Sequence, residues 1–311
     1  MDHLKIDFCD FWTGFNKEDN LLINLLRHNY KVEISANPDL LIYSCYSFNH
    51  LKYSCYKVFY TGENVRPNFV DCDFSLTFDY SNYSNRNLRL PLYRWRGDLE
   101  NLILPKDSSA IFQQKTKFCC MLVSNPNGKE RNEFYDKLGK YKKVDSGGIY
   151  RNNIGGRVED KDAFIKSYKF VLSFENASND GYTSEKLIEP LLANSLPVYW
   201  GNPKIEKDFN SKSFINVHQY SSFEKVIEEI IRIDNNDDAY FEYLNQPYFK
   251  NNVVPKELKY DVIANELFAG IERIKLHKSI SSTKKNRILQ RVNKYRKIIN
   301  SKLTQKPHCY C

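Results

Sequence analysis

Long hydrophobic runs are missing from this sequence of 311 residues. No stretch approaches the roughly 20 apolar residues that a membrane-spanning helix needs. Met1–Asp10 contains acids where a secretory signal peptide would have an apolar run. We therefore expect a cytoplasmic chain, and its hydrophobic content of 41% predicts a sizeable core.

Metal-binding cysteine patterns are also missing. None of the eight cysteines forms a CxxC pair or a cysteine–histidine array with the spacing of a zinc site. Free thiols are expected, and Cys119 and Cys120, which lie in an apolar run, should pack in the core as small hydrophobic residues. The full set is Cys9, Cys45, Cys55, Cys72, Cys119, Cys120, Cys309 and Cys311.

Excess positive charge is absent from most of the chain and concentrated at its end. The net charge is +8, yet residues 273–311 hold 12 of the 46 lysines and arginines and none of the 38 acids. Residues 1–272 therefore carry 34 basic against 38 acidic side chains, a net charge of −4. The total of +8 consequently says little about what the body of the protein binds.

The basic end has the pattern of an amphipathic helix, with apolar residues at helical spacing and basic residues beside them. Such a helix is typical of attachment to an anionic membrane surface, and the alternative is a terminal helix packed on its own protein. RNA binding is disfavoured because Tyr295 is the only aromatic residue in the helical part, so no row of rings is available for base stacking. The apolar residues are Ile288, Val292, Tyr295 and Ile299, and the basic ones are Lys284, Arg291, Lys294 and Lys302.

The body alternates apolar runs with helical patterns, which predicts an α/β fold in two halves joined around residues 95–115. Ser221 and Glu224 have the spacing of a capping box at the start of a helix. The strand candidates are Leu4–Phe8, Leu40–Ser44, Lys57–Tyr60, Phe74–Phe78, Phe118–Val123, Tyr168–Phe174 and Leu196–Trp200, and the helix candidates include Asn20–His28 and Glu185–Asn194.

The most informative stretch is Tyr168–Pro203. A buried strand ends in Phe-Glu-Asn, passes through a loop that contains glycine, and enters a helix at Thr183 or Ser184. In α/β sheets, ligands bind beyond the carboxyl ends of strands, and a helix N-terminus there attracts anions. Lys186 in the first turn adds a cation, which is favourable at a helix N-terminus only if an anion such as phosphate offsets it. The alternative is that Glu185 and Lys186 belong to an ordinary solvent-exposed first turn of a helix.

Three blocks of this sequence resemble the α-1,3/4-fucosyltransferases of glycosyltransferase family 10. The segment FENASNDGYTSEKL, followed by LPVYWGNP, is similar to the family's strand end, Tyr-x-Thr-Glu-Lys helix start and following strand. The segment VFYTGENVRPNF (Val58–Phe69) resembles a block of the N-terminal half in bacterial members. A third segment, LVSNPNGKERNEFYDKL (Leu122–Leu138), resembles the opening of their nucleotide domain.

The resemblance implies a GT-B fold, with two Rossmann-like domains that face each other across a cleft. We expect an acceptor-binding domain over residues 1–105, a domain for GDP-fucose over residues 106–270 and a basic helical tail over residues 271–311. It also implies inversion at the anomeric carbon, which needs a base for the acceptor hydroxyl group and cations for the departing diphosphate.

Each of these roles has a candidate through the resemblance. Glu63 matches the glutamate of the family's Thr-Gly-Glu-Asn block and is the expected general base. Arg131 and Lys186 are expected to hold the diphosphate, and Glu185 to accept hydrogen bonds from sugar hydroxyl groups. The other expected donor-binding residues are Asn125, Asn176 and Tyr182.

No metal or other cofactor is expected, because Lys186 would replace the divalent ion of many other glycosyltransferases. Asp71-Cys72-Asp73 imitates a DxD metal motif but lies outside the nucleotide half. The expected function is transfer of fucose from GDP-fucose to an N-acetyllactosamine-type glycan, such as one on lipopolysaccharide, at the inner face of the cytoplasmic membrane. The alternatives are a transferase for another GDP-deoxysugar and a nonenzymatic RNA- or lipid-binding protein with a basic tail.

Overall fold

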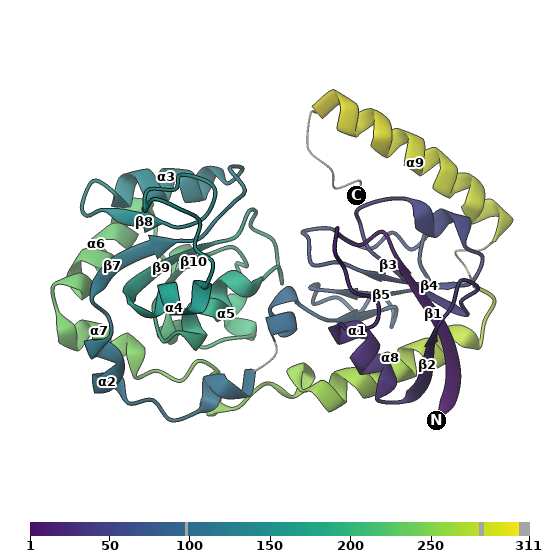
Figure 1. The fold of residues 1–311 in the computed structure, drawn as a ribbon, viewed down its shortest axis with the longest axis horizontal. Helices are drawn as coiled ribbons and strands as arrows, with labels where there is room; N and C mark the ends of the chain where they lie inside the picture. Colours follow the sequence, from purple (N-terminus) through teal and green to yellow (C-terminus); the bar gives the residue numbers. More distant parts are fainter. Residues whose placement is uncertain (97–98, 280–282, 305–311) are drawn as a thin grey trace. The chain divides into compact units, whose positions relative to one another are not determined.

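The computed structural model describes residues 1–96, 99–279 and 283–304, and the chain divides into two compact units (Figure 1). The first unit contains Met1–Pro91 and the chain from Lys256 onward, and the second contains Leu92–Pro255. The sequence-based boundary at residue 270 differs from this division because helix α8 (Tyr260–Lys275) packs on the sheet of the first unit. The sequence-based boundary at residue 105 lies after Pro91, where the first segment of that unit ends. Predictions for Cys309, Cys311 and the side chains of Lys284, Ile299 and Lys302 lie outside the described residues.

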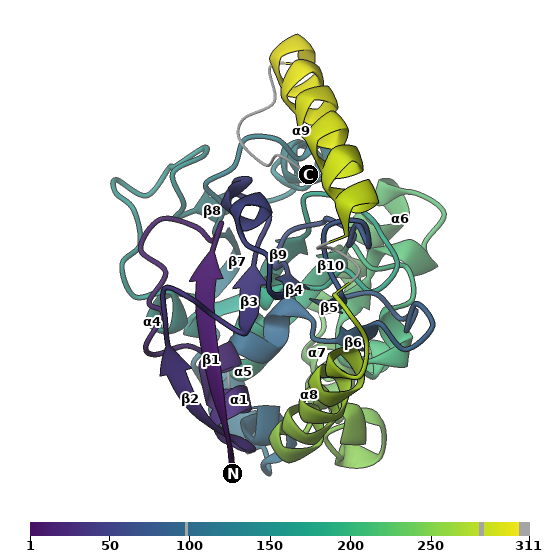
Figure 2. The same cartoon turned by 90° about the vertical axis from the view of Figure 1, so that its right-hand side faces the viewer.

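Six parallel strands form the sheet of the first unit, in the order β2-β1-β3-β4-β5-β6. Helices α1 (Leu21–Arg27) and α8 lie side by side on one face of this sheet (Figures 1 and 2). Because β1, β3 and β4 are neighbours and run in parallel, the loops that follow them meet at one edge of the sheet. The strands are β1 (Asp2–Cys9), β2 (Tyr30–Ile34), β3 (Leu40–Tyr43), β4 (Tyr56–Tyr60), β5 (Phe74–Thr77) and β6 (Asn87–Arg89).

Helix α1 illustrates how the local sequence sets an element. Asn20 is the N-cap, and its side chain accepts a hydrogen bond from the backbone N–H of Ile23 at 3.0 Å. Such a cap stabilises a helix by about 1 kcal/mol. Four of the apolar residues of α1 are then buried, namely Leu22, Ile23, Leu25 and Leu26.

Five parallel strands form the sheet of the second unit, in the order β11-β10-β9-β7-β8. Here β7, β9 and β10 are neighbours, so the loops after them also meet at one edge. The strands are β7 (Lys117–Met121), β8 (Val144–Ser146), β9 (Tyr168–Phe174), β10 (Leu196–Trp200) and β11 (Ile215–Asn216). The helices are α2 (Ser108–Gln113), α3 (Lys129–Leu138), α4 (Lys161–Lys166), α5 (Glu185–Leu192), α6 (Phe223–Asp234) and α7 (Asp237–Leu244).

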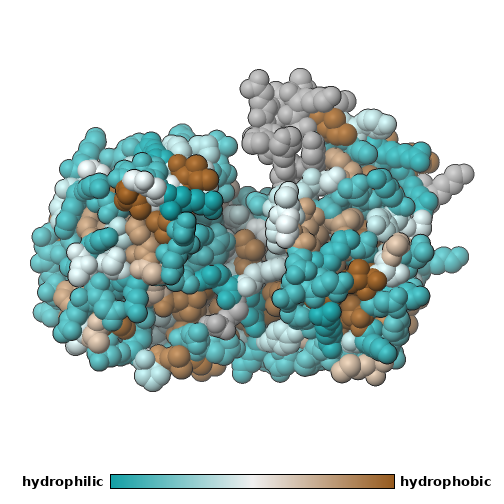
Figure 3. All heavy atoms as spheres, in the orientation of Figure 1, coloured by the Kyte–Doolittle hydropathy of each residue, from teal (hydrophilic) through white to brown (hydrophobic). Residues whose placement is uncertain are grey.

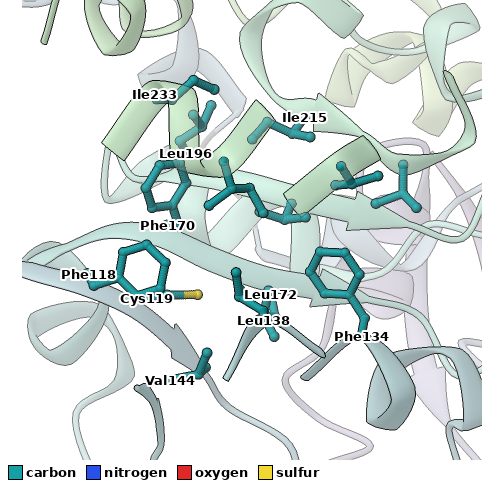
Figure 4. Packing of buried hydrophobic residues seen from close by; sticks show 14 of the residues in the cluster. Phe118, Cys119, Phe134, Leu138, Val144, Phe170, Leu172, Leu196, Ile215 and Ile233 are labelled. Atoms are coloured by element: carbon teal, nitrogen blue, oxygen red, sulfur yellow. The ribbon is translucent and has the colours of Figure 1, made fainter. Parts of the chain in front are cut away.

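The core of the second unit lies on both faces of its sheet. Figure 4 shows one face, where the rings of Phe118 and Phe170 pack edge to face with centroids 5.6 Å apart. Cys119 belongs to this cluster, whereas Cys120 packs on the opposite face with Ile165. Both cysteines are almost fully buried, which confirms the prediction that they act as core residues.

The capping-box prediction is wrong by one residue. Ser222 is the N-cap of α6, and its side chain accepts a hydrogen bond from the N–H of Lys225. Two serines stand side by side at this point, and either has the chemistry of a cap, so the backbone conformation decides between them.

The basic end of the chain forms helix α9 (Lys284–Thr304), and its polar side contacts the rest of the first unit. Gln290 is buried and donates a hydrogen bond from Nε2 to the carbonyl oxygen of Val70 at 2.8 Å. The apolar residues Ile288, Val292 and Tyr295 are 59%, 43% and 66% exposed. The helix therefore packs on its own protein while its apolar stripe faces outward.

Most of the surface in Figure 3 is hydrophilic, and the apolar surface forms small patches. Among the helices of the described residues, none combines the length and the hydropathy needed to cross a bilayer.

Candidate functional site

Polar groups gather beyond the carboxyl ends of β7 and β9 in the second unit. The central one is Glu175, the first residue after β9, which is fully buried. Its carboxylate accepts hydrogen bonds from the backbone N–H of Ser184 at 2.7 Å and from the Ser184 hydroxyl group at 2.8 Å. It also forms an ion pair with Lys186 Nζ at 3.1 Å. A buried carboxylate needs such partners, because an unpaired charge inside a protein is costly.

Ser184 is the N-cap of helix α5, and it is one of the two positions at which the sequence predicts that this helix begins. Its side chain caps the helix by accepting a hydrogen bond from the N–H of Lys186 at 3.4 Å. The same hydroxyl group donates to Glu175, so the cap and the buried carboxylate hold the first turn together. Unpaired backbone N–H groups and the helix dipole make this end attractive to an anion.

Lys186 is a well-positioned cation at the start of this helix. Its side chain is 20% exposed, so it can reach a ligand in solution. Burial alone would lower the pKa of Lys186, but the carboxylates of Glu175 and Glu185 outweigh it and raise that pKa above its usual value. Because folding raises this pKa, the ion pair adds stability at neutral pH, and the contribution is lost only as the pH rises through the folded-state pKa.

Arg131 of α3 forms a second cluster with two asparagines. Its Nη1 donates to Asn176 Oδ1 at 3.0 Å, and its Nη2 donates to the carbonyl oxygen of Asn125 at 2.6 Å. The side chain is only 1% exposed, and its buried Nε has no hydrogen-bond partner within the described part of the chain. Burial lowers the pKa of Arg131, but the guanidinium group stays charged at neutral pH.

Gly128 explains how Arg131 fits. A Cβ at this position would lie 2.6 Å from Arg131 Cζ, so a larger residue would displace the guanidinium group from its present position. The charges of Arg131, Glu175 and Lys186 also influence one another. The two clusters therefore form one polar region, with the exposed Asn125 and Asn176 at its surface.

Tyr182 lies in the loop between β9 and α5 and is 4% exposed. The Tyr199 hydroxyl group donates to its carbonyl oxygen at 3.4 Å, and its own N–H donates to the Asn179 carbonyl oxygen at 3.1 Å. Gly181, before it, has a positive φ of 82° and donates from its N–H to Asn202 Oδ1 at 2.9 Å. Tyr182 is thus part of the packed base of the loop.

The sequence patterns assign no role to Glu175, although it is the glutamate of the Phe-Glu-Asn strand end. Its signal is a carboxylate directly after a buried strand, followed by a lysine in the first turn of the next helix. A buried strand end cannot carry a charge without a partner, so this pair could be inferred from the pattern.

The expected base, Glu63, lies in the first unit, in the loop that follows β4. Its backbone N–H donates to Thr61 Oγ1 at 2.9 Å, and its carboxylate Oε1 accepts a hydrogen bond from the Tyr46 hydroxyl group at 2.8 Å. Oε2 has no hydrogen-bond partner within the described ranges. The side chain is half-buried, so one oxygen is held in place and the other can accept a proton.

The aspartates of the apparent DxD motif have structural roles. Asp73 Oδ2 accepts hydrogen bonds from the backbone N–H of Lys57 and the hydroxyl group of Ser279, both at 2.9 Å. Asp71 Oδ2 accepts one from Asn68 Nδ2 at 2.8 Å. Within the described residues, no group of three His, Cys, Asp or Glu side chains could hold a metal ion.

Both units match families of known proteins. Residues 6–95 match the N-terminal domain of the alpha-(1,3)-fucosyltransferase FucT, and residues 112–293 match the C-terminal domain of glycosyltransferase family 10 (fucosyltransferase). The alpha-(1,3)-fucosyltransferase FucT of Helicobacter pylori is 32% identical over 287 residues, which covers 78% of this chain and 59% of that protein. The 4-galactosyl-N-acetylglucosaminide 3-alpha-L-fucosyltransferase 9 of Homo sapiens is 34% identical over 136 residues, or 42% of this chain and 37% of that protein. This chain thus spans about three fifths or less of the length of these relatives.

Solved structures agree with the fold. A crystal structure of alpha1,3-fucosyltransferase with GDP-fucose matches with a TM-score of 0.74 at 28% identity, covering 91% of this chain and 93% of that chain. The structure of Anabaena Alr3699/HepE with UDP and glucose has a TM-score of 0.55 at 10% identity, covering 87% of this chain and 100% of that chain, and shares the fold alone. The prediction of a GT-B-type α/β fold with two Rossmann-like domains is confirmed.

Proposed function

This chain belongs to glycosyltransferase family 10, the fucosyltransferases, and from that premise we propose that it is an α-1,3-fucosyltransferase that uses GDP-fucose. The acceptor in this proposal is a hydroxyl group of an N-acetyllactosamine-type glycan, free or on lipopolysaccharide. Similarity to an alpha1,3-fucosyltransferase structure with GDP-fucose over 91% of the chain supports it.

The observation that carries the proposal is the buried Glu175 carboxylate, which holds Lys186 at the start of α5. Lys186, the N–H groups of the first turn and the nearby Arg131 supply hydrogen-bond donors and two cations suited to a diphosphate. Glu185 can accept hydrogen bonds from sugar hydroxyl groups, and the exposed amides of Asn125 and Asn176 can donate to phosphate oxygens.

In the proposed reaction, Glu63 accepts the proton of the acceptor hydroxyl group as its oxygen forms a bond to C1 of fucose. The bond between C1 and the β-phosphate oxygen breaks, and its electron pair leaves with GDP. Attack from the face opposite GDP inverts the configuration at C1. The Tyr46 hydrogen bond to Oε1 directs the other carboxylate oxygen to the proton.

Lys186 and Arg131 stabilise the charge that builds up on the departing diphosphate. In this proposal they supply the positive charge that a divalent metal ion supplies in many other glycosyltransferases. Transfer is therefore expected to continue when metal ions are chelated.

Calorimetric titration with nucleotides, carried out in EDTA, tests the donor site. We expect GDP and GDP-fucose to bind, GDP-mannose to bind more weakly, and UDP-sugars to bind at least about tenfold more weakly than GDP, since the site must discriminate between bases. A preference for another GDP-deoxysugar over GDP-fucose would support the alternative transferase. Absence of GDP binding would contradict the donor site and favour the nonenzymatic alternative.

We also propose that α9 attaches the protein to an anionic membrane surface, as a peripheral protein at the inner face of the cytoplasmic membrane. The apolar Ile288, Val292 and Tyr295 are exposed, and so is the basic Arg291 next to Val292. A basic helix with an exposed apolar stripe gains from both burial of apolar area and attraction to anionic lipids.

The substitution Ile288→Asp tests this membrane proposal. It removes an apolar contact and adds a repelled charge, so binding to phosphatidylglycerol vesicles should fall about tenfold in a flotation assay. The matched control is Ile149→Asp, because Ile149 is 63% exposed in the second unit, against 59% for Ile288. Equal vesicle binding by the two variants would contradict the proposal, and transfer to a soluble acceptor should be unchanged in both.

A further inference from the structure

A tight turn follows β1, at the same sheet edge as Glu63. The backbone N–H of Phe15 donates to the Trp12 carbonyl oxygen at 3.2 Å, and Gly14, between them, has a φ of 85°. A positive φ at the third position is typical of a type II turn and favours glycine there. The turn holds Trp12 at the surface, where it is 37% exposed.

The aromatic rings of this turn pack on one another and on the core. The rings of Phe11 and Phe15 stack with centroids 4.0 Å apart, and the ring of Phe15 also packs on the buried Phe8 at 5.3 Å. The Trp12 ring meets the Phe15 ring edge to face at 5.2 Å. These contacts fix the orientation of Trp12, so its position is set before any ligand arrives.

Two side-chain contacts, both made by Tyr46, connect the Trp12 ring to Glu63, the expected base. The Trp12 ring packs edge to face on the Tyr46 ring, with centroids 6.3 Å apart. The Tyr46 hydroxyl group in turn donates to Glu63 Oε1 at 2.8 Å. A ligand group that rests on Trp12 is therefore within one or two sugar rings of the Glu63 carboxylate.

Backbone contacts hold the loops after β1 and β3 together. Asp10, in a left-handed conformation with a φ of 59°, accepts a hydrogen bond at its carbonyl oxygen from the Tyr46 N–H at 3.0 Å. Its buried carboxylate accepts hydrogen bonds from the N–H groups of Asn49 and His50, both at 2.9 Å. The distance between Trp12 and Tyr46 is thus set by the backbone as well as by ring packing.

We propose that Trp12 is the sugar-stacking residue of the acceptor subsite and that a pyranose ring of the acceptor lies on its indole face. Pyranoses such as galactose expose C–H groups on one face, and these are attracted to the electron-rich face of an aromatic ring. The sugar that carries the attacked hydroxyl group, or its neighbour, is then held beside Glu63. This inference rests on the proposed function and assigns a residue for acceptor affinity within it.

Acceptor kinetics at saturating GDP-fucose test the proposal. Trp12→Leu keeps apolar bulk but removes the ring, so the acceptor KM should rise about tenfold while kcat changes less than about twofold. Trp12→Phe keeps an aromatic face, so its KM should lie within about threefold of the unchanged protein. Thr13→Ala, in the same turn, is the matched control and should leave both constants unchanged.

A measurement on the unchanged protein tests the proposal even if a variant fails to fold. Saturation of aromatic protons by NMR should transfer to the C–H protons of one sugar face of bound N-acetyllactosamine. An unchanged KM in Trp12→Leu, equal effects of Leu and Phe, or no transfer from aromatic protons would each overturn the inference. Failure of the unchanged protein to transfer fucose would instead remove the proposed function, so the two failures are distinguishable.

Discussion

The variant Glu63→Gln should lose almost all fucose transfer, by a factor of about 10³, while GDP binding stays unchanged. The amide can still accept the hydrogen bond from the Tyr46 hydroxyl group, so the loop should keep its structure. It cannot take up the proton of the acceptor hydroxyl group at neutral pH. Initial rates of GDP release with a glycan acceptor, together with calorimetry, measure both parts.

A control for Glu63→Gln is Glu18→Gln, which makes the same change at a carboxylate that is 69% exposed. This control should transfer fucose at the rate of the unchanged protein. Full activity in Glu63→Gln would remove Glu63 as the base and with it the proposed mechanism. Loss of GDP binding in that variant would also contradict it, because Glu63 and the donor residues lie in different units.

The variant Lys186→Met should lower kcat/KM by about 10² to 10³, because the departing diphosphate loses the more exposed of its two cations. GDP affinity should fall about tenfold, by loss of a charge-assisted hydrogen bond. Lys140→Met, at an exposed lysine of the same unit, is the control and should change neither quantity. Kinetics and calorimetry under identical salt conditions give the comparison.

Lys186→Met also leaves Glu175 buried without its ion-pair partner, which should cost about 3 kcal/mol of the free energy of unfolding. The double variant Glu175→Gln with Lys186→Met removes both charges and should recover part of that stability. Activity should not recover with it. Recovery of GDP affinity in the double variant would mean that Lys186 acts only through stability.

Much of the second unit could be predicted from the sequence. The patterns predict β9 and β10 with the bounds that the structure gives, because both are buried runs of apolar and aromatic residues. The strands that the patterns do not predict are β2, whose residues are partly exposed, and β6, β8 and β11, which have only two or three residues each. Such short or edge strands form through pairing with neighbours and carry little pattern of their own.

Tertiary packing explains the remaining differences. The sequence patterns do not predict α8. This helix packs on the sheet of the first unit although it follows the second unit in the sequence, so the sequence-based boundary at 270 misses the return of the chain to the first unit. The periodicity of α9 likewise predicts an amphipathic helix, whereas the buried Gln290 shows that a polar side makes the contact. For Glu175, the sequence shows a carboxylate at a strand end and a lysine eleven positions later, whereas its complete burial follows only from tertiary packing.

The most direct test of the proposed function is the product formed from GDP-fucose and N-acetyllactosamine by the purified protein in EDTA. We expect fucose to be joined to O3 of N-acetylglucosamine in α linkage, with inversion at C1 and one GDP released for each fucose transferred, as read by NMR. Unchanged GDP-fucose and acceptor after prolonged incubation, or a product with retained configuration, would contradict the proposal.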